Sequence, residues 1–171
     1  MPHEVGLKLR EIVWRCIEPQ MKIAQACRGV TGDLAQQSAI CNTLVAIPVS
    51  RRLHLFELDP HCLPELKDEK IPFVTIGSGQ RAADPFLAFL RRIFWQDRQP
   101  TISEGVFTAL WTVRHAIDVL PAYVFGPEQV VTISQEKDGF NAMELSDEQL
   151  EEHREAIGQA ERSLANFRTR S

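Results

Sequence analysis

The sequence predicts a mixed α+β fold, and three features of its 171 residues carry that prediction. Apolar residues recur at helical spacing near both ends of the chain, and short runs rich in β-branched residues lie between them. Two consecutive helical segments then separate the third predicted strand from the fourth. That order disfavours a simple alternation of strand and helix and favours helix layers lying on sheets.

Residues 5–28 open the chain with a helical pattern. Its apolar stripe consists of Leu9, Ile12, Val13, Cys16 and Ile17. Pro19 either kinks this helix or begins a second one, because proline fits the first helical turn better than the interior. Residues 29–38, GVTGDLAQQS, are predicted to form a turn or linker.

Three strands are expected next. Residues 39–47, AICNTLVAI, form a near-continuous apolar run that is typical of a strand buried on both faces. Pro48 and the pair Ser50-Arg51 mark a turn into residues 52–59, RLHLFELD, so these two strands are predicted to form an antiparallel hairpin. A polar connection over residues 62–71 leads to a third strand at residues 72–76.

The second half is mainly helical. Apolar positions at helical spacing, with many aromatic residues among them, continue to Trp95, and they are predicted to form core or a subunit interface. Thr101 and Glu104 have the form of a capping box that opens a second helix. A fourth strand is expected at about residues 129–134, followed by a turn at 137–139. Ser146 and Gln149 form another capping box, which opens the C-terminal helix of residues 146–171.

The composition is that of an ordinary soluble domain, with 44% hydrophobic and 25% charged residues. A net charge of −4 gives no indication of a nucleic-acid or anionic-membrane partner. The four cysteines form no C-x-x-C pair, so we interpret them as reduced thiols. We therefore expect one cytoplasmic domain over residues 1–171, without a cofactor and without a membrane or nucleic-acid partner.

The turn Gly77-Ser78-Gly79 joins the third predicted strand to the helix after it. Glycines let the backbone turn sharply and let several N–H groups point at one place. Such a turn can cradle a phosphate or an oxyanion, but it lacks the lysine of a P-loop and the G-x-S-x-G context of a nucleophilic serine. A purely structural strand-to-helix turn is the other interpretation.

Residues 38–135 resemble the C-terminal two thirds of a proteasome-type subunit, a member of the N-terminal-nucleophile hydrolase superfamily. The resemblance rests, in order, on AICNTLVAIP, LHLFELDP, IGSG at residues 76–79, TISEGV and QVVTI. It implies an αββα sandwich, two antiparallel sheets between two helix layers, with the first strands missing here. It also implies ring-type homo-oligomers, or assembly with other proteasome-like subunits, and polypeptide as substrate.

In that family the nucleophile is an N-terminal threonine whose own amino group is the general base, and a lysine on an early strand keeps the site electropositive. The resemblance gives Ser78 a supporting role, holding the N-terminal group, and places Gly77 and Gly79 at the substrate-binding turn. Both assignments are carried over from the family's IGSG motif.

The sequence departs from the family where the chemistry should be. No strand pattern precedes Leu7, so the threonine and lysine strands are absent, and the domain is N-terminally truncated relative to the family. Thr31 follows Val30 where the family has glycine, and we set it aside as a nucleophile. Lys67 and Lys70 fall in the predicted polar connection, and Asp118 lies inside a helical pattern.

The expected function is therefore that of a proteasome-like subunit linked to intracellular protein breakdown, without the threonine nucleophile in this chain. The alternative is a non-enzymatic assembly or scaffold subunit. A third interpretation is a hydrolase or ligand-binding domain that uses the glycine-serine-glycine turn directly. No metal site is expected, because the spacing of His54, Asp59, His61 and Cys62 matches no established ligand pattern.

Overall fold

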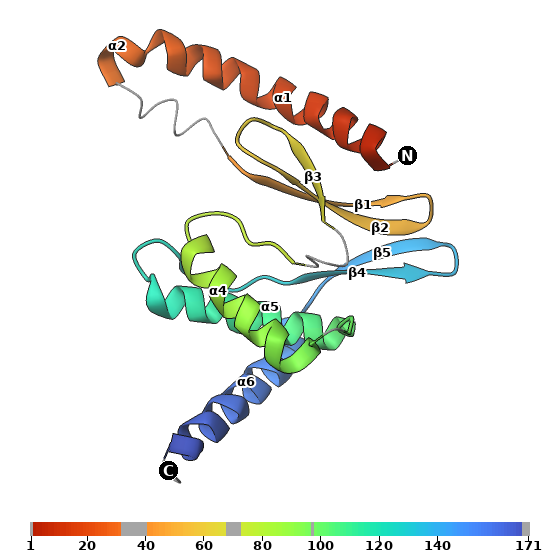
Figure 1. The fold of residues 1–171 in the computed structure, drawn as a ribbon, viewed down its shortest axis with the longest axis vertical. Helices are drawn as coiled ribbons and strands as arrows, with labels where there is room; N and C mark the ends of the chain where they lie inside the picture. The colour runs from red at the N-terminus through yellow and green to blue at the C-terminus, as the bar shows by residue number, and fades with distance from the viewer. Residues whose placement is uncertain (1, 32–40, 68–72, 97, 169–171) are drawn as a thin grey trace. The chain divides into compact units, whose positions relative to one another are not determined.

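The computed structural model describes residues 2–31, 41–67, 73–96 and 98–168 (Figure 1). The chain divides into two compact units, Met1–Gly77 and Ser78–Ser171. The first contains α1 (Pro2–Ala26), α2 (Arg28–Thr31), β1 (Thr43–Val49), β2 (Arg52–Leu58) and β3 (Pro64–Lys67). The second contains α4 (Gln80–Leu90), the π-helical turn η1 (Arg91–Trp95), α5 (Ile102–Val119), β4 (Val131–Glu136), β5 (Gly139–Glu144) and α6 (Asp147–Arg168). The predicted α+β class is confirmed.

In the first unit, β1 and β2 form the predicted antiparallel hairpin. The register pairs Thr43 with Leu58 and Val49 with Arg52, so the connection is the two residues Ser50 and Arg51. Both have positive φ, 51° and 62°. Two-residue connections of this left-handed kind match the right-handed twist of the flanking strands.

Helix α1 covers one face of this sheet (Figure 1). Phe56 and Leu58 alternate toward the helix from β2 and pack against Ile17, with exposures of 2%, 0% and 8%. Partly buried residues complete this core: Val5, Leu9, Val13, Met21, Val45 and Ile47. The expectation that β1 is buried on both faces is wrong, because its residues are half-buried or exposed along the strand.

The stripe that α1 buries differs in part from the predicted one. Ile12 is 59% exposed and Cys16 is also exposed, because the positions that face the core follow a spacing of four residues from Val5 through Leu9 to Ile17. Pro19 lies inside α1, so it does not begin a second helix. Among the described residues, no helix combines the length and apolar character needed to cross a bilayer.

The third strand is β3, which lies inside the predicted polar connection of residues 62–71. Residues 73–76 are not a strand, and residues 71–72 lie outside the described residues. Lys67 Nζ lies 2.7 Å from Glu57 and 3.0 Å from Glu65, and its side chain is 8% exposed. These ion pairs offset the positive charge of the lysine, so the charged strand β3 can pair with β2 at the edge of the sheet.

The second unit is built around one aromatic and aliphatic core. Leu90 from α4, Leu110 and Trp111 from α5, and Leu150 and Ile157 from α6 are its buried members. Phe86 and Phe107 meet Trp111 edge to face, with ring centroids 5.7 and 5.4 Å away. Core packing is therefore confirmed for Phe86, Phe107 and Trp111. Phe89 on α4 and Phe94 on η1 are 38% and 40% exposed.

Both predicted capping boxes are present. The Thr101 hydroxyl accepts from the Glu104 N–H, and the Glu104 carboxylate accepts from the Thr101 N–H at 2.9 Å. Ser146 and Gln149 exchange the same two bonds at the start of α6. Strand β4 starts two residues later than predicted, and β5, which pairs with it as a hairpin, was not predicted. Each box satisfies N–H groups that the first helical turn leaves unpaired.

We expect Arg51→Gly to stabilise the first unit. A non-glycine residue in the left-handed region costs about 1–2 kcal/mol of steric strain, which glycine removes. Glycine also loses about 0.5–1 kcal/mol more backbone entropy on folding, and this offsets part of the gain. The free energy of unfolding, measured by urea denaturation, should rise by roughly 0.5–1 kcal/mol. The control Arg52→Gly changes a residue inside β2 and should lower it. A loss of stability in both variants would contradict the turn geometry.

A second prediction concerns acid pH. Hydrogen bonds from Arg98, one of them 2.8 Å long, and then from the Thr101 N–H lower the pKa of Glu104 from 4.5 to about 2. The stabilising contribution is therefore present above pH 4.5 and is lost as the pH falls toward 2. In Glu104→Gln, the decline of thermal stability over this window should be shallower than in the unchanged chain. If the thermal stability of Glu104→Gln and of the unchanged chain declined in parallel over this window, the prediction would be wrong.

Candidate functional site

The glycine-serine-glycine turn lies at the start of α4, as predicted, but the strand predicted before it is absent, since residues 73–76 are not a strand. Gly77 has a φ of +91°, a backbone conformation that side chains rarely adopt, although a Cβ there would meet nothing within 4 Å. Gly79 is the N-cap of α4, and its carbonyl accepts from the N–H groups of Ala82 and Ala83, each at 3.0 Å. Gly77 is thus required for its backbone conformation, not for lack of space.

Gly79 is required for the opposite reason, because there is no room for a side chain at this position. A Cβ at this position would lie 2.9 Å from Val124 Cγ2 and 3.5 Å from Ala116 Cβ. Ala116 belongs to α5, and Val124 belongs to the loop that follows it. The turn therefore packs directly against the end of α5, and only a residue without a side chain fits this approach.

Ser78 connects the turn to the same loop. Its hydroxyl donates a 2.9 Å hydrogen bond to the carbonyl of Tyr123, 45 residues further along the chain. The loop is itself held to α5, because the N–H groups of Tyr123 and Val124 both bond to the carbonyl of Leu120. Ser78 is exposed, so its oxygen can still accept hydrogen bonds from outside.

This arrangement sets limits on the chemistry of Ser78. Its proton is directed to a backbone carbonyl, which is not a general base. In the described part of the chain, no histidine or carboxylate is hydrogen-bonded to Ser78. A serine nucleophile needs such a base within hydrogen-bond reach. Ser78 is therefore suited to position a donor group such as an amine.

The other candidate residues do not join this site. Asp118 lies on α5 and is exposed, and Thr31 is the last residue of α2. Lys67 lies on a strand, contrary to the prediction, but its ammonium group forms ion pairs with Glu57 and Glu65. Lys70 lies outside the described residues.

Two of the four residues considered for zinc, Asp59 and Cys62, have structural roles. Asp59 Oδ1 accepts from the N–H groups of His61 and Leu63, each at 2.8 Å, and so shapes the turn between β2 and β3. Cys62 is 1% exposed, and its burial raises the pKa of its thiol. Across the described residues, no group of three or more potential ligands is arranged to hold a metal ion.

The loop after α5 is a part of the site that the sequence did not predict. It carries Tyr123 and Phe125, which are 68% and 82% exposed, next to the residues that contact Ser78 and Gly79. The available signal was Pro121 with Gly126-Pro127, which marks a loop but does not say which turn that loop meets.

Searches against protein-family models and curated proteins found nothing similar to this chain.

Gly79→Ala tests the close approach. The added methyl group must displace Val124, so we expect the free energy of unfolding to fall by about 1–3 kcal/mol. The matched control is Gly105→Ala inside α5, where a Cβ meets nothing within 4 Å, and this change should stabilise the chain by up to about 1 kcal/mol. Adding Val124→Ala to Gly79→Ala should restore part of the loss. Equal effects of the two single changes would be inconsistent with the packing.

Proposed function

We propose that this chain is a proteasome-type subunit of the N-terminal-nucleophile hydrolase superfamily, and that it takes part in cytoplasmic protein breakdown. The observation that carries the proposal is the bond from Ser78 to the carbonyl of Tyr123. It leaves an exposed serine oxygen as an acceptor at the turn that the resemblance assigns to holding an N-terminal amino group. A protonated or neutral amine supplies the N–H donors that such an oxygen accepts.

The order of elements after the turn supports the same proposal. Two consecutive helices, α4 and α5, follow Gly79, and the chain then returns in a strand, as the resemblance implies. The finer fold that we propose is the αββα sandwich. In the first unit, the register places Leu44, Leu53 and Leu55 on the sheet face opposite the one that α1 covers. A sheet with apolar residues on both faces needs a second covering layer.

The chemistry that we propose for a complete site is hydrolysis of polypeptide by an N-terminal threonine. Its amino group would be the general base, and Ser78 would hold that group in position. The present sequence has no strand pattern before Leu7 that would carry such a threonine. A segment encoded upstream in the same reading frame, or a neighbouring subunit, would have to supply it. On this proposal Ser78 is a positioning residue and takes no part in bond cleavage.

A second candidate is a non-enzymatic assembly subunit. The exposed rings of Tyr123 and Phe125 favour it, because aromatic residues are enriched where proteins contact each other. In that case the turn and the loop would form a contact surface, and Ser78 would stabilise the loop. The two candidates share an assembled state and differ in whether a threonine reaches Ser78.

Both candidates predict that the purified chain self-associates, which size-exclusion chromatography with light scattering would detect. A clean monomer over a wide concentration range would refute both. To separate them, the upstream reading frame should be translated and the longer product assayed with fluorogenic peptides. The enzyme proposal expects peptide cleavage that an alanine at the new threonine abolishes, and that Ser78→Ala reduces in rate. Loss of assembly in Phe125→Ser without any cleavage by the longer product would favour the assembly subunit.

A further inference from the structure

The first unit has a pocket that the proposed function does not use. It lies between α1 and the turn that connects β2 to β3, and its volume is about 540 Å³. Sites for small organic molecules range from about 300 to 1,000 Å³. Its apolar lining is Leu7, Trp14, Ile17, Met21 and Pro60, and its polar lining is Arg10, Glu11 and His61. A mostly apolar pocket with a few polar groups is typical of a ligand site.

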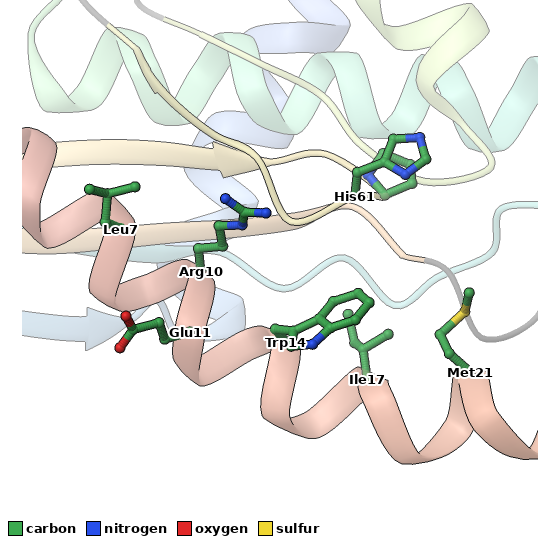
Figure 2. A pocket seen from close by; sticks show the side chains of 8 residues that line it. Leu7, Arg10, Glu11, Trp14, Ile17, Met21 and His61 are labelled. Atoms are coloured by element: carbon green, nitrogen blue, oxygen red, sulfur yellow. The ribbon is translucent and has the colours of Figure 1, made fainter.

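Both walls of the pocket are fixed in place. Ile17 is 8% exposed and belongs to the core that α1 shares with the sheet, so the helix wall is anchored. On the other wall, Asp59 accepts the N–H groups of His61 and Leu63 and so fixes the turn. Figure 2 shows Arg10 and Trp14 rising from α1 on the side where His61 lies. The pocket is therefore formed before any ligand arrives, which lowers the cost of binding.

Charge and shape define the class of ligand. Arg10 is a permanent cation with an exposed side chain, and the ion pair between Lys22 and Glu18 lies elsewhere on α1. Glu11 also borders the pocket, but Figure 2 shows its carboxylate pointing away from the Trp14 indole. Trp14 is 42% exposed and offers a flat apolar surface to a planar ring. Guanidinium groups bind carboxylates through paired hydrogen bonds.

We propose that this pocket binds a small aromatic carboxylic acid, with its ring against Trp14 and its carboxylate on Arg10. His61, on the opposite wall, closes the pocket over the ring and adds a polar contact. Nothing in this proposal depends on the assembly of the chain or on the glycine-serine-glycine turn.

The test uses 2-naphthylacetate as the probe and isothermal titration calorimetry as the measurement. Its neutral analogue, 2-naphthylacetamide, has the same ring system without the charge. We expect the acid to bind about tenfold more tightly than the amide, and Arg10→Gln to remove that difference, because a charge-assisted bond is lost. The matched control is Arg15→Gln, which changes an exposed arginine of α1 outside the pocket and should leave both affinities unchanged.

Nuclear magnetic resonance of the labelled chain locates the site independently. Amide shifts on adding the acid should concentrate in residues 7–21 and 59–63, and Trp14→Phe should weaken binding of acid and amide alike. His61→Gln gives a second variant on the other wall in case a change in α1 impairs folding. Equal binding of acid and amide, an unchanged affinity in Arg10→Gln, or no shifts at millimolar probe would each overturn the proposal.

Discussion

The close approach of Gly79 to the end of α5 is the constraint on which the candidate site depends. Gly79 allows Ala116 and Val124 to approach the backbone, and this contact brings Ser78 within hydrogen-bond distance of Tyr123. The hydrogen bond alone would be worth about 1 kcal/mol and could not hold the loop. Packing therefore sets the geometry, and the serine bond makes that geometry specific.

Most of the fold could be predicted where the signal is local. Capping boxes and hairpin turns are decided by residues within three or four positions of each other, and Thr101, Ser146 and the Ser50–Arg51 connection behave as predicted. Strand β3 was missed because its charged sequence is stabilised by Glu57, a partner on another strand. Propensity describes a residue's own preference and cannot include the side chain it will meet across a sheet.

The candidate site shows the same division between local and distant information. The positive φ of Gly77 follows from a turn signal in the sequence, but the need for glycine at position 79 comes from Val124, far along the chain. Sequence reasoning could therefore identify the turn and could not say what it touches. For this reason the contact between Ser78 and the Tyr123 loop could not be predicted, although Pro121 and Gly126 had marked that segment as a loop.

The direction of one hydroxyl proton separates the interpretations of Ser78. A nucleophilic serine must give its proton to a base, and a phosphate-binding serine must give it to the ligand. Here the proton is given to the Tyr123 carbonyl, and what remains on the exposed oxygen is acceptor capacity. In this arrangement the oxygen can accept a hydrogen bond from a donor, and an N-terminal amine is a donor of the kind that the proteasome-type proposal requires. An anion at this turn would instead have to compete with the Tyr123 carbonyl for the Ser78 proton.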